Sequence, residues 1–268
     1  MKDLHLRKNM IDKLKVLKGM IRNYENWRDI ILNQLRIKGE YALKLRNGFK
    51  FFVRSKRDAK AIEDMFFKKC HVLPDDYLFK KNPVLIDMGA HIGAYSIWAY
   101  SKNRTSTIIS LEPDPRNFRL PKKNIKHNNI KNIHPVFACV SEKTGPVDFF
   151  LNKRNPMGSS LVIRNVSKIK SSGFTIKDII EKFGLTKIDV LKLDIEDAEF
   201  DILLGLDKRT LNMIDFIDVE YHLVAGHQSE KELEEALKKN GFQIILNKRY
   251  HKNFLGIIYA KKGIWHSF

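Results

Sequence analysis

Short apolar runs alternate with helical patterns along the chain from Val84 onward, and this alternation restricts the possible folds more than any other feature. Apolar runs bounded by turn residues are typical of buried strands. Strands are predicted at Val84–Met88, Ser106–Leu111 and Ile133–Val140 and within KIDVLKLD and MIDFIDVEYH. Helices are predicted at Gly93–Tyr100, from Asp114 towards His127, at Phe174–Phe183, and within AEFDILLGL and EKELEEALKKN. The order favours an α/β class with a doubly wound, mostly parallel sheet covered on both faces.

The last two apolar runs, FQIILNK and NFLGIIYAKK, follow each other without an intervening helix. They predict a closing pair that supplies a terminal antiparallel strand. An inserted hairpin is predicted from GPVDFFLN and SSLVIRN. Gly184 is expected just past the end of one helix, and Ser229 with Glu232 forms a predicted capping box for another.

The residues before Pro83 follow a different pattern. An amphipathic helix or helix pair is predicted from Leu6 to Leu35, and a hairpin in YALKLRNGFKFFVRS turns at Asn-Gly, the dipeptide favoured in type I′ turns. A helix is expected from Arg57 to Lys69, followed by a loop in HVLPDDYLFKKNP. We therefore expect an N-terminal helical and hairpin appendage at residues 1–83, which helps to cover the acceptor site, and a main domain at residues 84–268.

Composition indicates a soluble, globular, cytoplasmic protein. Of 268 residues, 43% are hydrophobic, and no window approaches the length of a membrane span. The two cysteines are far apart, which favours neither a disulfide framework nor a zinc site. The net charge of +18 would attract polyanions such as RNA, but the lysines are spread over the whole sequence. A lysine-rich, solvated surface is the simpler interpretation.

The turn after the first predicted strand of the main domain contains Asp87, Gly89 and Gly93. Glycines here allow a ligand to approach the backbone at a helix N-terminus, as in dinucleotide-binding turns. A carboxylate at the strand end would repel a pyrophosphate but attract a ligand that carries an ammonium and a sulfonium. S-adenosylmethionine is such a ligand, and Asp87 would lie near its amino group or order the turn. Alternatively, Asp87 only caps the helix and the glycines only permit tight packing.

Glu112 directly follows the second predicted strand of the main domain, about 20 residues past the glycines, where nucleotide-binding folds place an acid for ribose hydroxyls. This position also suits a dinucleotide. Together with the turn, it predicts a nucleotide site at the carboxyl ends of the strands.

Several motifs occur in an order that resembles the FkbM-type S-adenosylmethionine-dependent methyltransferases. The matching stretches are IDMGAHIGAYS, LEPDPRNFRLPKKNI, ACVSEKTGPVDF, GSS, IDVLKLDIEDAEFDILLG and FIDVEYH. The resemblance implies a Rossmann-like class I methyltransferase fold, with the adenine near Cys139 and Val140. One departure is Asp197, where the family usually has glycine. The predicted cofactor site comprises Asp87, Gly89, Ala90, His91, Gly93, Tyr95, Ser96, Glu112, Pro113, Asn117, Cys139 and Val140.

Candidate catalytic residues follow the central strands, because open α/β sheets bind ligands at their carboxyl ends. We expect His222 or Asp194 to accept the proton of an acceptor hydroxyl, with Lys192 able to lower the pKa of that hydroxyl. The alternative is an ion-paired cluster of Lys192, Asp194, Glu196 and Glu220 that holds the strand ends together without touching substrate. Asp194, Glu196 and Glu220 offer hard oxygen ligands of the kind that suit Mg²⁺. No spacing diagnostic of a metal site supports this alternative, so no metal is expected.

These observations predict a methyltransferase that uses S-adenosylmethionine, most simply to methylate a hydroxyl of a small molecule or sugar. One alternative keeps the cofactor and makes RNA the acceptor, because of the positive net charge. Another is a nucleotide-binding module without catalysis. A nicotinamide oxidoreductase is least favoured, because of Asp87 and the missing third glycine.

Overall fold

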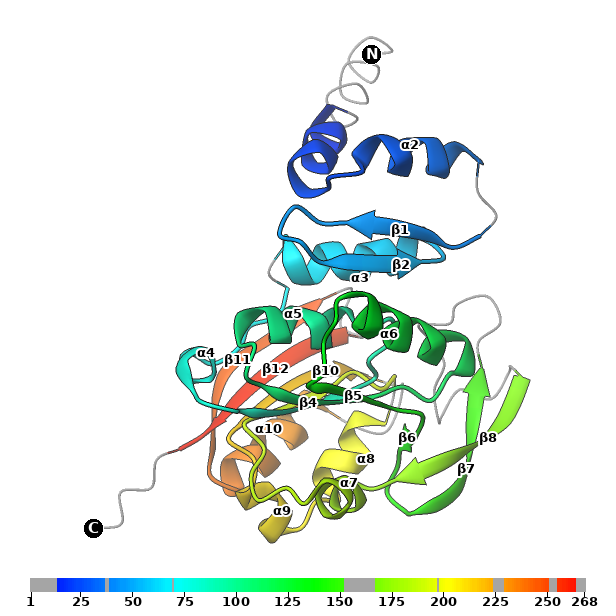
Figure 1. Cartoon of the computed structure of the whole chain (residues 1–268). Helices are drawn as coiled ribbons and strands as arrows, with labels where there is room; N and C mark the ends of the chain where they lie inside the picture. The colour runs from blue at the N-terminus through cyan, green and yellow to red at the C-terminus, as the bar shows by residue number, and fades with distance from the viewer. Residues whose placement is uncertain are drawn as a thin grey trace, which may run out of the picture.

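A computed structural model describes residues 14–36, 39–68, 70–151, 167–196, 198–223, 229–250 and 255–263. Its centre is a seven-stranded sheet with helices on both faces, and a smaller layer of helices and a hairpin lies beyond one of these helical layers (Figure 1). The sheet consists of β3 (Val84–Met88), β4 (Thr107–Leu111), β5 (Ile133–Val136), β9 (Val190–Leu193), β10 (Phe216–His222), β11 (Phe242–Tyr250) and β12 (Leu255–Lys262).

The strand order β11-β12-β10-β9-β3-β4-β5 confirms the predicted doubly wound, Rossmann-like sheet. The five strands from β5 to β10 run parallel, and β12 runs antiparallel to both of its neighbours, β10 and β11. Although β12 comes last in the chain, it lies between β10 and β11 and not at the sheet edge. The order reverses next to β3, because its two neighbours are β4 and the much later β9. A ligand site is expected at this switch point.

Helices cover both faces of the sheet. On one face lie α5 (Ala94–Lys102) and α6 (Pro115–His127) (Figure 1). The other face carries α7 (Ile176–Phe183), α8 (Glu199–Leu204), α9 (Lys208–Asn212) and α10 (Glu230–Lys239). Alternate residues of one strand serve the two cores: Leu85 belongs to the first hydrophobic cluster, whereas Ile86 and Met88 belong to the second.

The predicted helix ends agree with the structure where they are described. Gly184 ends α7 in a left-handed conformation with φ 60°, and the Ser229 hydroxyl accepts from the Glu232 amide at the start of α10. Asp114 caps α6 by accepting from the Arg116 amide.

The segment before Pro83 contains a helix at residues 14–23 and five further elements. These are α2 (Trp27–Arg36), β1 (Tyr41–Lys44), β2 (Lys50–Val53), α3 (Lys56–Phe66) and α4 (Asp75–Phe79). The segment packs on α5 and α6, and its buried Leu43, Phe51 and Ile62 share a cluster with Ile97 of α5. The N-terminal segment therefore shares a continuous hydrophobic core with one face of the main sheet.

Two predictions for this segment were wrong. The stretch predicted as a loop contains α4, whose Tyr77 is buried and donates to Ser106. The hairpin does not use a type I′ turn, because Gly48 has φ 91° while Asn47 is not among the residues with positive φ. Leu45 and Phe49 pair across the three intervening residues, so the glycine takes the left-handed position of a three-residue loop.

The predicted strand at 133–140 is divided in two. β5 ends at Val136, opposite Leu111 at the end of β4, so no partner in the main sheet remains beyond that point. The chain then forms β6 (Cys139–Val140), which pairs with β8 (Ser167–Phe174) in a separate three-stranded sheet.

The inserted hairpin forms in part as predicted. β7 (Gly145–Leu151) pairs antiparallel with β8, while the predicted partner SSLVIRN lies outside the described residues. Phe174 ends β8 and does not begin the following helix. Across the described ranges, no helix combines the length and apolarity that crossing a bilayer requires.

Candidate active site

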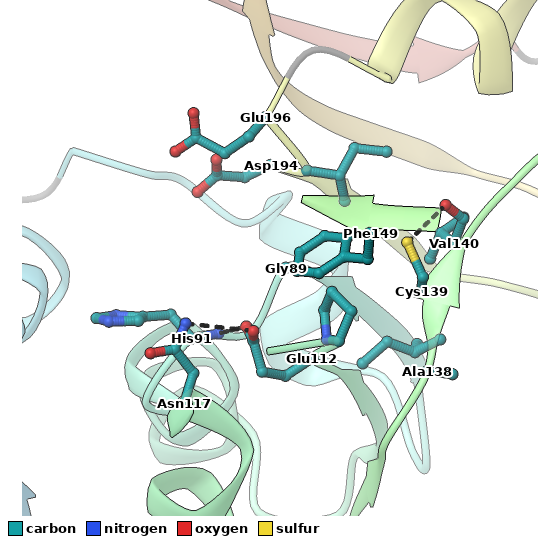
Figure 2. Close-up of a pocket in the computed structure, with 13 residues that line it drawn as sticks. Gly89, His91, Glu112, Asn117, Ala138, Cys139, Val140, Phe149, Asp194 and Glu196 are labelled. Carbon is teal, nitrogen blue, oxygen red and sulfur yellow. Dashed lines mark hydrogen bonds between the residues drawn. The ribbon is translucent and has the colours of Figure 1, made fainter. Parts of the chain in front are cut away.

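A pocket opens at the carboxyl ends of β3, β4 and β9, where the strand order reverses (Figure 2). It is bounded on one side by the small sheet that contains β6 and β7. The lining residues are Gly89, His91, Leu111, Glu112, Pro113, Asn117, Ala138, Cys139, Val140, Phe149, Asp194, Ile195 and Glu196. Carboxylates and apolar side chains therefore face the same space.

The turn after β3 uses its amides within the protein. Gly89 and Ala90 both donate to the Leu111 carbonyl, and the His91 amide donates to Glu112 Oε2 at 2.7 Å. Gly89 has φ 81°, and a Cβ there would lie 1.7 Å from the carbonyl oxygen of Asp194. A phosphate site needs N–H groups that point at the ligand, so these bonds disfavour a pyrophosphate at Gly89, Ala90 and His91.

Glu112 is buried beside the turn, and its side chain lines the pocket. Besides the His91 bond, Oε1 accepts from the Asp114 amide at 2.9 Å and from Asn117 Nδ2 at 3.3 Å. Burial raises the pKa of Glu112 to about 7, although the nearby His91 and the hydrogen bonds from the Asp114 and His91 amides oppose the rise. A neutral donor from a ligand, such as a hydroxyl, would stabilise the charged form.

The other side of the pocket is apolar. It is formed by Leu111, Ala138, Val140 and Phe149, with the Cys139 thiol among them (Figure 2). Burial raises the pKa of Cys139 to about 12, so this thiol is protonated at neutral pH and is no nucleophile. Such a surface suits a flat, largely apolar group such as a purine.

Asp87 is fully buried and does not line the pocket. Its Oδ2 accepts from Ser96 Oγ at 2.6 Å, and Lys192 Nζ lies 3.1 Å from Oδ1. Of the two roles predicted for Asp87, these contacts favour ordering the turn, since its charge is balanced inside the protein. Besides Glu112, the carboxylates that line the pocket are Asp194 and Glu196 (Figure 2).

Lys192 is buried and holds the ends of β3 and β9 together. Its Nζ donates to the carbonyls of Met88 at 3.3 Å and Gly89 at 3.1 Å, and lies 3.5 Å from Asp194 Oδ2. Burial would lower the pKa of Lys192, but Asp87 and Asp194 keep it above its ordinary value, so the ammonium stays charged. Loss of water contact would raise the pKa of Asp194, yet Lys192 holds it below its ordinary value.

His222 lies at the end of β10 between two glutamates. Nδ1 is 3.2 Å from Glu199 Oε1, and Nε2 is 3.5 Å from Glu196 Oε2. Burial would lower the pKa of His222, but these carboxylates raise it to about 10. An imidazole that is protonated at neutral pH cannot accept a proton, so this arrangement disfavours His222 as the base.

Not every predicted site residue reaches the pocket. Those that line it are Gly89, His91, Glu112, Pro113, Asn117, Cys139, Val140 and Asp194. Those that do not line it are Asp87, Ala90, Gly93, Tyr95, Ser96, Lys192 and His222. Tyr95 instead donates to buried Asp218 at 3.1 Å. Asp197, the departure from the family motif, lies outside the described residues.

Five of the lining residues were predicted from the sequence neither as cofactor-binding nor as catalytic residues. Leu111, Ala138, Phe149, Ile195 and Glu196 also line the pocket. Leu111 and Ala138 are adjacent in the sequence to predicted residues, and Ile195 and Glu196 are the next two residues after Asp194. Adjacency in the sequence could therefore have indicated these four residues. Phe149 had no such signal, because only the pairing of β7 with β8 carries this side chain to the pocket.

The pocket fits S-adenosylmethionine better than a dinucleotide. A buried carboxylate at Glu112, an apolar slot and two pocket-facing carboxylates match ribose, adenine and a cationic amino acid portion, respectively. Among the residues the structure describes, no group of three or more His, Cys, Asp or Glu side chains could hold a metal ion.

Several similar proteins are named as methyltransferases. The chain is 24% identical to Methyltransferase sdnD of Sordaria araneosa over 72% of its length and 86% of that protein. It is 24% identical to 2-O-methyltransferase NoeI of Sinorhizobium fredii, over 54% of this chain and 65% of that protein. It is 25% identical to Hexuronic acid methyltransferase AglP of Haloferax volcanii, over 53% of this chain and 57% of that protein.

Among solved structures, the precorrin-6y C5,15-methyltransferase of Geobacter metallireducens is 12% identical with a TM-score of 0.43, covering 79% of this chain and 90% of that one. The model of the methyltransferase FkbM domain matches residues 87–244, from the end of β3 into β11. Because this match spans more than half of the sequence, the chain belongs to the FkbM family of S-adenosylmethionine-dependent methyltransferases.

Proposed function

We propose that this protein transfers a methyl group to a hydroxyl oxygen of a sugar or another small molecule. Two relatives support the acceptor class, since one is named a 2-O-methyltransferase and another a hexuronic acid methyltransferase. The single observation that carries the proposal is the pocket at the switch point of the sheet, into which Glu112 and Asp194 both face.

Each part of the pocket has a role in holding the cofactor. Glu112 would accept hydrogen bonds from the ribose hydroxyls, and the apolar slot at Val140 and Phe149 would hold the adenine. Asp194 and Glu196 would offset the positive charge of the methionine portion. When bound, S-adenosylmethionine supplies an electrophilic methyl group on a sulfonium.

Asp194 is the proposed base. Methyl transfer requires an aligned acceptor oxygen and removal of its proton. Asp194 lines the pocket, and the Lys192 ammonium 3.5 Å away keeps it ionised and fixes its place at the end of β9. Lys192 does not line the pocket, so it acts on Asp194 as a positioning residue and not on the acceptor hydroxyl.

Calorimetry with S-adenosylmethionine and S-adenosylhomocysteine tests the cofactor assignment, and absence of binding at millimolar concentration would exclude it. A panel of sugars that includes hexuronic acids, assayed for S-adenosylhomocysteine release, tests the acceptor class. Asp194→Asn should lower kcat at least about a hundredfold, which is the usual contribution of a general base. A variant that keeps full kcat would remove Asp194 from that role.

RNA is the second candidate acceptor, because the net charge is +18. Binding to phosphates by lysine and arginine must weaken steeply as salt concentration rises. Titration with tRNA between about 50 and 200 mM salt, together with an assay for methylated RNA, separates this acceptor from a sugar.

A further inference from the structure

A closed ring of polar contacts joins the N-terminal segment to the cofactor pocket. Arg54, directly after β2, donates from Nε to Asp58 Oδ2 at 2.9 Å and from an Nη to Asn117 Oδ1 at 2.9 Å. Asn117 Nδ2 donates to Glu112 Oε1, and Glu112 Oε2 accepts the His91 amide. The His91 imidazole completes the ring of contacts, because its Nε2 lies 3.1 Å from Asp58 Oδ1.

The acidic and amide members of this ring, Asp58, Glu112 and Asn117, are buried. Asp58 is 2% exposed and Asn117 is 2% exposed, so water competes little for their hydrogen bonds. Arg54 also donates to the Arg116 carbonyl at 2.7 Å, which fixes its guanidinium over the start of α6. Neither Arg54 nor Asp58 lines the pocket, and both precede the part of the chain that the family model matches.

The hairpin that carries Arg54 is fastened to α6 through side-chain amides. Asn124 accepts from the Phe52 amide at 2.7 Å, and Asn128 accepts from the Lys50 amide at 2.8 Å and donates to the Lys50 carbonyl at 2.7 Å. These two asparagines form hydrogen bonds with the backbone of β2, as a neighbouring strand would. The place of Arg54 relative to α6 is therefore set by the backbone of β2.

Arg54 determines the orientation of the Asn117 amide. Guanidinium can only donate, so the amide oxygen of Asn117 must face Arg54 and its Nδ2 is left to face Glu112. A donor in that place favours the charged form of Glu112, which is the form that accepts from ribose hydroxyls. Asp58 acts on His91. Its contact with the imidazole holds the His91 backbone at φ 51°, an uncommon conformation for a residue with a side chain.

We propose that Arg54 and Asp58 are positioning residues for cofactor binding, which hold Glu112 and the His91 turn in the geometry that receives the adenosine ribose. This inference rests on the proposed cofactor site, and it makes the N-terminal segment part of that site.

A double-mutant cycle tests the proposal on the full-length chain. Arg54→Ala should weaken S-adenosylhomocysteine binding about tenfold in calorimetry. In a Glu112→Gln background the same change should cost less than about threefold, because residues that act through one another are not additive. The KM for S-adenosylmethionine should rise, while kcat at saturating cofactor stays within about twofold.

Further variants guard against a general loss of structure. Arg54→Lys keeps a positive charge beside Asp58 but lacks the fork that reaches Asn117 and the Arg116 carbonyl, so it should also weaken binding. Asp58→Asn removes the charge at nearly constant size and should do the same. The matched control is Lys60→Ala, which removes an exposed ion pair with Asp64 on the same helix and should leave affinity unchanged.

The outcomes separate the two proposals. If the wild-type chain binds no S-adenosylhomocysteine, the proposed function fails together with this inference. If the wild type binds and folded Arg54→Lys and Asp58→Asn variants bind within twofold of it, only the positioning role fails. Equal losses for Arg54→Ala with and without Glu112→Gln would also overturn it, since they would indicate a structural effect that does not pass through Glu112.

Discussion

Two carboxylates in one pocket have opposite electrostatic surroundings. Burial raises the pKa of Glu112 to about 7, whereas Lys192 holds the pKa of Asp194 below its ordinary value. The first group therefore changes charge near neutral pH, while the second stays ionised. In an unliganded site, Glu112 is a group whose protonation a ligand can shift.

Cofactor affinity should depend on pH through Glu112. Ribose hydroxyls donate to the carboxylate, so binding favours the ionised form, and affinity for S-adenosylhomocysteine should fall about tenfold from pH 8 to pH 6 around the pKa of about 7. Calorimetry at several pH values measures this. In Glu112→Gln, binding should be weaker and nearly independent of pH over that range. An unchanged slope in the variant would assign the titration to another group.

The same shift affects folding of the unliganded chain. The pKa of Glu112 rises on folding from 4.5 to about 7, so the folded state holds this proton more tightly than the unfolded state. The contribution of Glu112 to stability is therefore present below about pH 4.5 and is lost as the pH rises to about 7. Glu112→Gln should remove that part of the pH dependence, as measured by urea unfolding at pH 5 and pH 8.

Gly89 should not accept a side chain. An added Cβ would lie 1.7 Å from the Asp194 carbonyl oxygen, and φ is 81°. Gly89→Ala should lower the free energy of unfolding by about 3 kcal/mol or more, because β3 and β9 would have to separate. Gly184→Ala is the matched control, since φ is 60° there and nothing lies within 4 Å of the added atom. Gly184→Ala should lower the free energy of unfolding by only about 1 kcal/mol. Equal losses in the two variants would show that backbone strain alone, and not the contact with Asp194, destabilises Gly89→Ala.

At the scale of secondary-structure elements, β12 lies between β10 and β11 because it pairs with both strands. The central position of β12 depends on a close approach to β10, because Gly256 lies opposite Tyr221 in the antiparallel register. The buried Tyr221 ring occupies the space that a side chain at Gly256 would need, and its hydroxyl donates to Asn247 of β11 at 3.1 Å. One tyrosine thereby packs over β12 and bonds to the strand beyond it.

Gly256→Ala should disturb this part of the sheet. The added Cβ would lie 2.3 Å from the Tyr221 hydroxyl oxygen and 2.4 Å from the ring carbon that carries it. Overpacking of this kind costs about 1–3 kcal/mol, which urea denaturation would detect. Combining it with Tyr221→Phe should recover little, because the ring remains. Wild-type stability of the single variant would show that Tyr221 can move freely.

One of the two hydrophobic clusters crosses the expected boundary near Pro83. Buried Leu43, Phe51 and Ile62 contact the layer that contains Ile97, and His71 reaches Asp218 of β10 at 2.8 Å. Removing the N-terminal segment would expose this apolar surface and leave Asp218 without one of its partners. The expected division at 83 and 84 is therefore a change in sequence pattern across which the packing continues.

A chain of residues 84–268 should not behave as an independent domain. It should bind a hydrophobic dye, aggregate on warming and lose affinity for S-adenosylhomocysteine, because its α5 and α6 layer would be uncovered. Adding residues 1–83 as a separate chain should restore part of the affinity if their packing is sufficient. Cooperative unfolding and wild-type affinity of the shortened chain would contradict this expectation.

Periodicity was sufficient for most of the main domain. The strand at Val84–Met88 agrees with its prediction at both ends, and Asp114, Gly184 and Ser229 mark helix ends as expected. Glu112 also lines the pocket, because a residue at the carboxyl end of a parallel strand beside the switch point borders the crevice in which ligands bind. These features depend on local burial and on the order of elements along the chain.

The ion-pair partners of the charged residues could not be predicted from periodicity. Asp87 was expected near the cofactor or as an ordering residue of the turn, but only tertiary packing places Lys192 of β9 3.1 Å from it and leaves Asp194 facing the pocket. His91 was expected at the cofactor and lines the pocket, but only tertiary packing places its imidazole 3.1 Å from Asp58 of the N-terminal segment. Sequence pattern reports whether a residue is buried, whereas the identity of its neighbour depends on which distant strands and helices are brought together. For this protein, the amino-acid order therefore specified the sheet, its switch point and the family, while long-range packing decided which carboxylates are neutralised and which remain for the ligand.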